Sequence, residues 1–183
     1  EVDELRGYAS QELKTLLERY DVRSDKDGGR LGGERSGKTF DDDNPFLLRD
    51  YDHCISCYRC VRVCEEQEGD YAISVKNRGF DTQIVAGIAG LLKDSSCTFC
   101  GQCVQTCPTG ALGDKKALRF TESEEPVGKT RSVCPYCGGG CSVDILTKGD
   151  KIVGTPPAMD GPANKGALCV KGQFATDFVP RGD

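Results

Sequence analysis

The chain is built around CISCYRCVRVC at residues 54–64 and CTFCGQCVQTCP at residues 97–108. Each stretch places three cysteines three residues apart and a fourth cysteine four residues later. Three thiols at this spacing let a short loop wrap one face of an iron-sulfur cubane, and the fourth thiol falls one helical turn further on. Because the pattern occurs twice, chance explains it poorly. The cysteine spacing therefore predicts iron-sulfur centres.

The spacing resembles that of two-cluster bacterial ferredoxins, in which the fourth cysteine of each run ligates the cluster of the other run. The resemblance assigns one [4Fe-4S] cluster to Cys54, Cys57, Cys60 and Cys107. It assigns a second [4Fe-4S] cluster to Cys97, Cys100, Cys103 and Cys64. Pro108, after Cys107, fits the ferredoxin pattern, whereas Glu65, after Cys64, departs from it and leaves the local turn open.

Disulfides and zinc are the alternatives for these eight cysteines. Disulfides staple loops together and do not need ligand spacing of this regularity. Zinc sites usually present thiols as separated C-x2-C pairs, and a C-x2-C-x2-C triplet gives a tetrahedral ion an awkward third ligand. Iron-sulfur ligation is the interpretation that uses every thiol of both runs.

The composition is that of an acidic electron carrier, and we expect it in the cytoplasm. The 183 residues carry a formal net charge of -5, and each oxidised cubane with four thiolates adds about two negative charges. This charge argues against nucleic acid and for partners with basic docking faces. No run is long and apolar enough to span a bilayer. Because the chain has no Trp, we expect the clusters to supply much of its stability and the apo form to fold poorly.

Residues 1–44 are expected to form a helix followed by a polar, glycine-rich linker. Apolar residues recur at spacings of three and four up to Tyr20, which is typical of a helix with one apolar stripe. We expect the stripe to pack on the rest of the fold, and a partner-binding helix is the alternative. From Asp21 to Asn44, glycines alternate with charges of both signs, as in linkers or extended wrapping segments.

Residues 45–120 are expected to form the ferredoxin-like domain. Short strands are predicted around the cysteine loops, at Pro45–Tyr51, Tyr71–Val75, Asp81–Val85 and Thr109–Leu112. Asn77–Gly79 predicts the turn of a hairpin, and the last strand is expected to close the domain. The single histidine, His53, precedes Cys54. We expect it to make a surface hydrogen bond rather than to ligate a cluster, because histidine ligation is the minority pattern at such centres.

Residues 121–130 form an acidic stretch broken by Pro126 and Gly128, which predicts a linker. Residues 131–183 then carry the remaining cysteines, as CPYCGGGC at residues 134–141 and a distant Cys169. Between these cysteines, Val143–Leu146 and Lys151–Val153 predict a second hairpin.

The third cysteine set could form one closed metal site. It consists of Cys134, Cys137, Cys141 and Cys169. Taken alone, this pattern also suits zinc, since tetrahedral zinc tolerates a distant fourth thiolate. Beside two ferredoxin clusters we expect a third [4Fe-4S] cluster, because an electron relay uses a redox metal and zinc offers none. Glycines 138–140 would let the backbone approach the cluster closely.

The third set also carries a specific resemblance. VCPYCGGGC at residues 133–141 and PANKGALCVKG at residues 162–172 resemble the amino-terminal iron-sulfur segment of the molybdopterin oxidoreductase superfamily, above all that of cytoplasmic formate dehydrogenases. NPF at residues 44–46 and CVRVCEE at residues 60–66 resemble NAD-dependent formate dehydrogenase alpha subunits and the large iron-sulfur subunit of complex I. The resemblance implies an α+β fold, with a two-cluster ferredoxin-like domain followed by a small β-rich [4Fe-4S] domain.

The same resemblance implies a cofactor environment. Lys171, two residues past the last cysteine, would lie between the third cluster and a pterin, as a cation that stabilises the reduced, more negative cluster. The pterin would be a Mo- or W-bis(molybdopterin guanine dinucleotide) in a downstream catalytic domain of the same subunit, so we also expect the chain to be the amino-terminal part of a longer protein. No residue of the chain is expected to perform formate chemistry.

The function implied is electron transfer through three [4Fe-4S] clusters between a formate-oxidising, carbon dioxide-reducing centre and an NAD-reducing partner. The implied partners are a flavin- and NAD-binding subunit and further iron-sulfur subunits. Two alternatives remain: a complex I-like or hydrogenase-associated relay subunit, and a freestanding polyferredoxin whose third site holds zinc.

Overall fold

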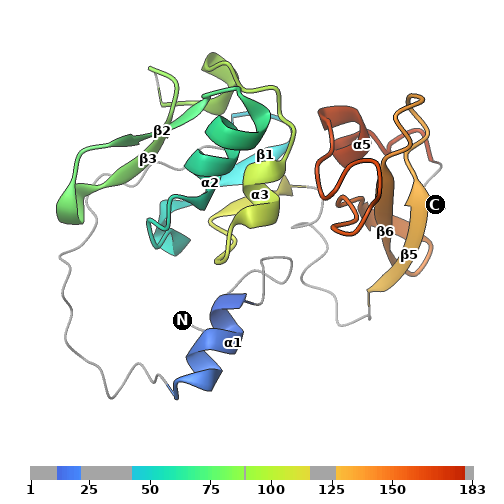
Figure 1. Cartoon of the computed structure of the whole chain (residues 1–183), viewed down its shortest axis with the longest axis horizontal. Coiled ribbons are helices and arrows are strands. Elements are labelled where there is room, and N and C mark those ends of the chain that lie inside the picture. The colour runs from blue at the N-terminus through green and yellow to red at the C-terminus, as the bar shows by residue number, and fades with distance from the viewer. Residues whose placement is uncertain (1–11, 22–42, 89, 116–126, 180–183) are drawn as a thin grey trace.

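The computed structural model describes residues 12–21, 43–88, 90–115 and 127–179. These residues form a helix, α1, and two lobes (Figure 1). The first lobe comprises the described residues from 43 to 115, and the second comprises residues 127–179. Together they mix short helices with small antiparallel sheets, as expected of an α+β protein.

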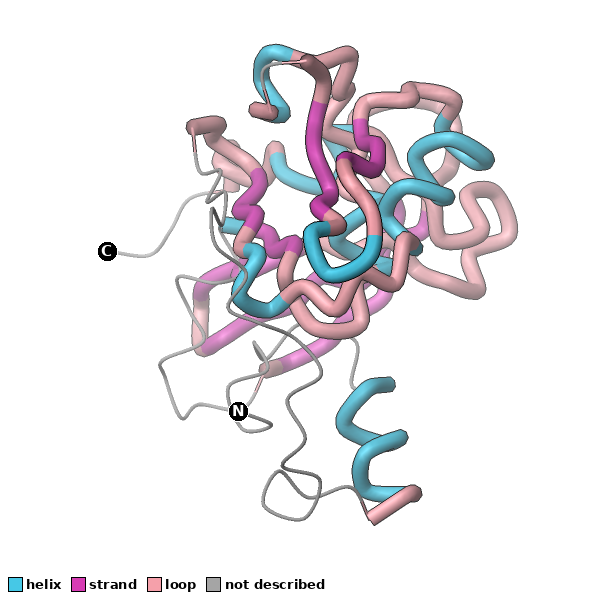
Figure 2. Tube along the Cα trace, turned by 90° about the vertical axis from the view of Figure 1, so that its left-hand side faces the viewer, coloured by secondary structure: helices cyan, strands magenta, loops and turns pink. Residues whose placement is uncertain are grey.

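Helix α1 (Glu12–Arg19) stands apart from both lobes (Figures 1 and 2). Leu16 and Tyr20 are 40% and 68% exposed, so the expectation that the apolar stripe packs on the fold is wrong at these two residues. The earlier part of the stripe and the glycine-rich segment 22–42 lie outside the described residues. Within the described residues, no helix has the length and apolar character needed to cross a membrane.

The first lobe arranges short elements around its cysteine loops. They are β1 (Leu47–Arg49), α2 (Arg59–Arg62), β2 (Ile73–Lys76), β3 (Gln83–Ala86), α3 (Gln102–Thr106) and β4 (Leu112–Asp114). β1 pairs antiparallel with β4, which joins the two ends of the lobe. The closing strand begins at Leu112 rather than at Thr109 as predicted, because Pro108 and Gly110 (φ +71°) turn the chain after α3.

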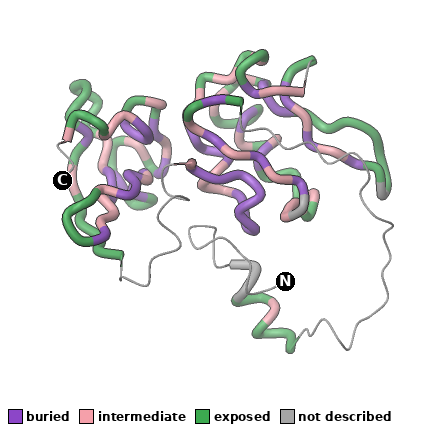
Figure 3. The backbone as a smooth tube through the Cα atoms, turned by 180° about the vertical axis from the view of Figure 1, so that it is seen from behind, coloured by how far each residue is buried: buried purple, intermediate pink, exposed green. Residues whose placement is uncertain are grey.

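β2 and β3 form the predicted hairpin, with Ile73 opposite Ala86. Both strands begin later than predicted, and at β2 the reason is that Tyr71 has a positive φ of 51°, which an extended strand does not allow. Ile73 and Ala86 are buried, and the tip of the hairpin is exposed (Figure 3).

Asn44 fixes the entry of the chain into the first lobe. Its Oδ1 accepts hydrogen bonds from the backbone N–H of Phe46 at 3.0 Å and of Leu47 at 2.7 Å, and its Nδ2 donates to the Leu47 carbonyl at 2.9 Å. Leu47 is fully buried. The ring of Phe46 lies 5.4 Å from that of Phe99, between their centroids, so β1 is tied to the second cysteine loop.

The second lobe is a three-stranded antiparallel sheet with one short helix. Its elements are β5 (Gly128–Val133), β6 (Ser142–Lys148), β7 (Lys151–Gly154) and α5 (Val170–Phe174). β6 and β7 confirm the predicted hairpin. β5, however, begins inside the segment that was expected to be a linker. All but one of its residues are exposed, so it lacks the apolar alternation by which strands are recognised, and pairing with β6 makes it a strand.

Candidate metal centres

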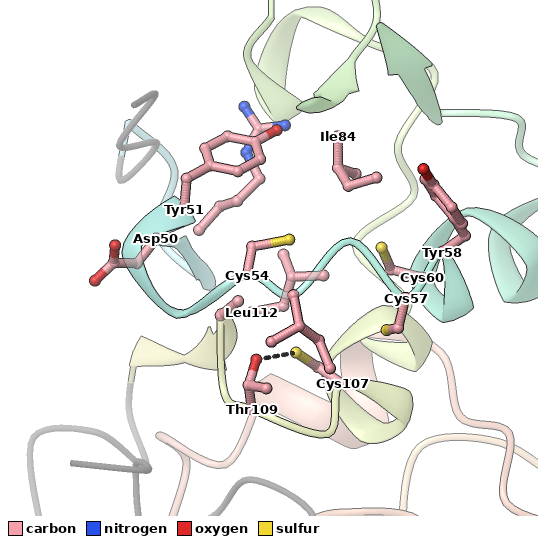
Figure 4. Close-up of a pocket in the computed structure, with 13 residues that line it drawn as sticks. Asp50, Tyr51, Cys54, Cys57, Tyr58, Cys60, Ile84, Cys107, Thr109 and Leu112 are labelled. Carbon is pink, nitrogen blue, oxygen red and sulfur yellow. Dashed lines mark hydrogen bonds between the residues drawn. The ribbon is translucent and has the colours of Figure 1, made fainter. Parts of the chain in front are cut away.

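The first cysteine run forms a loop whose backbone aims its thiols at one pocket. Ser56 and Tyr58 have φ values of 53° and 61°, and the Ser56 N–H donates to Cys54 Sγ at 3.4 Å. The pocket is lined by cysteines from both runs, namely Cys54, Cys57, Cys60 and Cys107 (Figure 4). Apolar side chains such as Ile84 and Leu112 complete it. The structure therefore brings together the four thiols that we assigned to the first cluster.

The pKa of Cys60 reflects its burial close to the other three thiols. Burial raises the pKa of its thiol to about 12, and the neighbouring thiols of Cys107, Cys54 and Cys57 add to the rise, in that order. Four thiolates cannot share such a pocket without a compensating positive charge. Iron supplies that charge in a cluster, so the donor set fits a [4Fe-4S] group.

The second run repeats the geometry of the first. Phe99 and Gly101 have φ values of 55° and 80°, and the Phe99 N–H donates to Cys97 Sγ at 3.4 Å. Burial raises the pKa of Cys103 well above its ordinary value, with further contributions from nearby thiols, namely Cys60, Cys100, Cys97 and Cys64. Burial also raises the pKa of Cys100 to about 11. The four thiols assigned to the second cluster are therefore neighbours as well, and Cys60 lies beside them.

The fourth cysteines of the two runs, Cys64 and Cys107, lie in different local backbone geometries. At Cys107 the helix stops, because Pro108 has no N–H to continue it. At Cys64 the chain runs on from α2 into a π-helical segment, Val63–Glu68, a geometry that is frequent at functional sites. Glu65 thus changes the local turn, as its departure from the ferredoxin pattern suggested, while Cys64 stays buried among the second-run thiols.

The third group gathers at the end of the β5–β6 sheet. Cys134 follows β5 and Cys141 precedes β6, and the Cys134 N–H donates to the Cys141 carbonyl at 2.8 Å. Burial raises the pKa of Cys141, and the thiols of Cys134, Cys137 and Cys169 add to the rise. The structure therefore brings these four thiols together too.

Asn164 positions the distant Cys169, a role that the sequence analysis missed. Its side chain accepts from the Ser142 N–H at 2.9 Å and donates to the carbonyls of Ser142 at 3.1 Å and Ala167 at 2.8 Å. These bonds clip the 164–167 loop onto the start of β6, beside Cys141. Only the PANKG motif in the sequence hinted at such a residue.

Two glycines lie directly against thiols of the third group. A Cβ on Gly139 would lie 3.5 Å from Cys137 Sγ and 3.7 Å from Cys141 Sγ, and one on Gly172 would lie 3.2 Å from Cys134 Sγ. The backbone therefore closes around the sulfur atoms, which fits a bulky inorganic group at this site. Among the described residues, no three His, Cys, Asp or Glu side chains are placed to hold a single metal ion.

The two remaining candidates lie beside the cysteine loops. Lys171 is an exposed residue of α5, two positions after Cys169. His53 places Nδ1 3.2 Å from Asp50 Oδ2, in agreement with the predicted hydrogen bond, although its side chain is half-buried rather than on the open surface.

Groups of thiols held by short loops, in small lobes of helices and sheets, are typical of iron-sulfur proteins. Residues 44–113 match the ferredoxin-like domain of NADH-quinone oxidoreductase subunit 3, and residues 128–181 match the molybdopterin oxidoreductase Fe4S4 domain. These two parts of the chain are therefore similar to iron-sulfur domains of a complex I-like subunit and of molybdopterin oxidoreductases, respectively.

Known proteins resemble the chain across both lobes. It is 34% identical over 140 residues to an NADH-quinone oxidoreductase subunit of Rhizobium meliloti, covering 76% of the chain and 16% of the relative. It is 32% identical over 175 residues to a Staphylococcus haemolyticus protein named "Putative formate dehydrogenase", covering 75% of the chain and 18% of the relative. The chain thus spans less than a fifth of the length of either relative. A chain of an NAD+-reducing [NiFe]-hydrogenase has a TM-score of 0.47 and 26% identity, over 56% of this chain and 42% of that one.

Proposed function

We propose that the chain is the iron-sulfur conduit of a molybdenum- or tungsten-dependent formate dehydrogenase and holds three [4Fe-4S] clusters. The observation that carries the proposal is that the twelve cysteines of the chain lie as neighbours in three groups of four, each with at least one buried thiol. The third group lies in a molybdopterin oxidoreductase Fe4S4 domain, and a relative named for formate dehydrogenase aligns across both lobes.

When bound, the clusters would supply one-electron redox chemistry. The residues of the chain hold and tune them. Backbone N–H groups of Ser56 and Phe99 donate to ligand sulfur atoms, which stabilises the thiolate form. Lys171 would place a cation beside the third site and favour its reduced, more negative state. The pterin would bind outside these residues, and an NAD-linked flavin subunit would exchange electrons with the conduit.

Metal analysis under anaerobic conditions tests the proposal. We expect the reconstituted chain to hold about twelve irons and no stoichiometric zinc, because each cubane takes four thiolates. Molybdenum or tungsten and formate-dependent dye reduction are expected only of the intact enzyme that includes the pterin-binding domain. About eight irons with one zinc would remove the third cluster from the proposal.

A complex I-like relay subunit is the second candidate, since the relative with 34% identity is an NADH-quinone oxidoreductase subunit. Both candidates require the same iron content. They differ in the pterin: an intact complex with full iron, no molybdenum or tungsten and no response to formate would favour the relay subunit.

A further inference from the structure

Helix α5 lies on the side of the second lobe that faces the first (Figure 1). It begins directly after Cys169. Its last two residues, Gln173 and Phe174, are 3% and 5% exposed. Phe174 belongs to the hydrophobic core of the first lobe, and its ring stacks on Phe46 with 5.1 Å between centroids. The short helix α5 therefore begins next to Cys169, the last cysteine of the third group, and ends in the packing between the two lobes.

Consecutive residues of α5 lie beside different cysteine loops. A Cβ on Gly172 would lie 3.2 Å from Cys134 Sγ, in the third group. A Cβ on Gly101 would lie 3.1 Å from both Cγ and Cδ of Gln173, and Gly101 stands between two cysteines of the second run, Cys100 and Cys103. Gly172 therefore borders the third group, and Gln173 borders the loop of the second run.

The contact with Gln173 adds to the positive φ as a reason for the glycine at position 101. The equivalent residue of the first run is Tyr58, which adopts a φ of 61° where Gly101 has 80°. A residue with a side chain can thus take up the left-handed conformation at this place in the loop. Tyr58 is 39% exposed, whereas Gln173 and Phe174 occupy the space above Gly101. The two cysteine runs therefore differ at the position that α5 contacts in the second run.

Other contacts hold this turn in place. The Thr155 hydroxyl, which is buried, lies 2.9 Å from the carbonyl oxygens of both Gly172 and Gln173. The Tyr136 hydroxyl, from the third cysteine loop, donates to the Ala175 carbonyl. Gln173 Oε1 is buried and has no hydrogen-bond partner within the described part of the chain, which is unfavourable for stability. Stability alone therefore does not explain a glutamine at this contact.

We propose that Gly172 and Gln173 form a positioning bridge between the third thiol group and the second cysteine run. The second-run site, and not the first-run site, is then the neighbour of the third site in the conduit. The inference rests on the proposed function, in which both groups hold [4Fe-4S] clusters. Gln173 acts through packing, because its Cγ and Cδ set how closely α5 approaches the Cys100–Cys103 loop.

The test compares two alanine variants of the iron-loaded, dithionite-reduced protein by electron paramagnetic resonance. In Gly101→Ala the added methyl group pushes Gln173 and Phe174 away. Gly69→Ala is the matched control, since Gly69 has a φ of 71° and a Cβ there meets nothing within 4 Å. We expect a weaker magnetic interaction between the third and second clusters in Gly101→Ala only, because the contacts of 3.1–3.3 Å force α5 to move away from the loop, with the iron content unchanged in both variants.

Gln173→Ala is a second test, in a variant that adds no atoms to the contact. It removes the contacting atoms and should weaken the same interaction, and the double variant Gly101→Ala/Gln173→Ala should recover the docking of α5 and part of the interaction. Equal spectra for Gly101→Ala and Gly69→Ala, or an unchanged spectrum for Gln173→Ala, would overturn the bridge and leave the conduit standing. About eight irons per chain in the unmodified protein, by four-iron cluster stoichiometry, would overturn the conduit and the bridge together.

Discussion

Ser56 and Phe99 show how single residues aim the thiols. They occupy the same position in the two cysteine runs, adopt φ values of 53° and 55°, and each donates its N–H to the preceding cysteine sulfur at 3.4 Å. A serine and a phenylalanine have little in common as side chains. The loop, and not the side chain, therefore imposes the left-handed conformation, which costs about 1–2 kcal/mol per residue.

The exchange of fourth ligands makes a prediction for a single thiol. Cys107 lies in the pocket of Cys54, Cys57 and Cys60, so Cys107→Ser should perturb the same spectroscopic signal as Cys57→Ser. Electron paramagnetic resonance of the reduced protein measures this. If the Cys107→Ser spectrum instead follows that of Cys100→Ser, the assignment of ligands to the two runs is wrong.

Lys171 makes a second prediction at this scale. If its cation favours the reduced third cluster, Lys171→Gln should lower the reduction potential of that cluster by about 40 mV, which corresponds to about 1 kcal/mol for a solvent-exposed unit charge. Lys171→Arg keeps the charge and should keep the potential. Redox titration of the signals of the three clusters measures the reduction potential in each variant. An equal fall in the potential of the third cluster in both variants would show that charge is not the cause.

At the scale of elements, one carboxylate ties β5 to β6. Asp144, on β6, has a side chain only 6% exposed, with Lys129 Nζ at 2.8 Å and Arg131 Nε at 2.6 Å, both from β5. Burial acts to raise the pKa of Asp144, but the hydrogen bonds from Lys129 and Arg131 outweigh it, and the pKa is lowered. The exposed strand β5 is therefore held by charge where it lacks apolar packing.

Asp144→Asn should destabilise the second lobe by about 1–2 kcal/mol, because it removes the carboxylate charge from two ion pairs whose cations are 62% and 47% exposed and which are worth up to about 1 kcal/mol each. Asp150→Asn, at the exposed β6–β7 turn, is the control and should have little effect. Because the folded-state pKa of Asp144 is lowered from 3.8, its stabilisation is present above that pH and is lost as the pH falls below it. Hydrogen exchange of β5 amides measures both effects; equal protection in the two variants would contradict the prediction.

At the scale of the whole molecule, metal and fold depend on each other. Burial raises the pKa of Cys60 to about 12 and that of Cys100 to about 11, from 9.0. A raised thiol pKa means that the folded apo protein holds its protons more tightly than the unfolded chain does. This stabilisation is present below about pH 9 and is lost as the pH rises through the raised values.

Apo protein should therefore lose stability as the pH rises from about 9 to about 11, whereas iron-loaded protein, whose ligand thiols are already deprotonated, should not. Thermal unfolding followed by circular dichroism, with and without an iron chelator, measures the difference. A gain in the stability of the apo form towards alkaline pH would contradict the sign.

The sequence alone predicted the two thiol-rich loops and both hairpins from local spacing, because a loop of fixed length can aim its thiols in few ways and alternating apolar residues define a strand wherever it lies. The grouping of Cys107 with the first run came instead from the resemblance to two-cluster ferredoxins, and the structure places Cys107 in the pocket of that run. The sequence could not predict β5, whose exposed residues carry no pattern until β6 pairs with them, or that Leu16 and Tyr20 of α1 remain exposed.

Only the tertiary structure decided how the two lobes meet. In the sequence, Gly101 is one glycine of a cysteine loop, and Gln173 is a polar residue that the spacing analysis passed over. Their contact joins residues of the two lobes that lie far apart in the sequence, and its contribution depends on shape complementarity between surfaces that form only on folding. Spacing along a chain predicts which thiols share one loop, but the distance between two metal centres depends on the packing between the lobes.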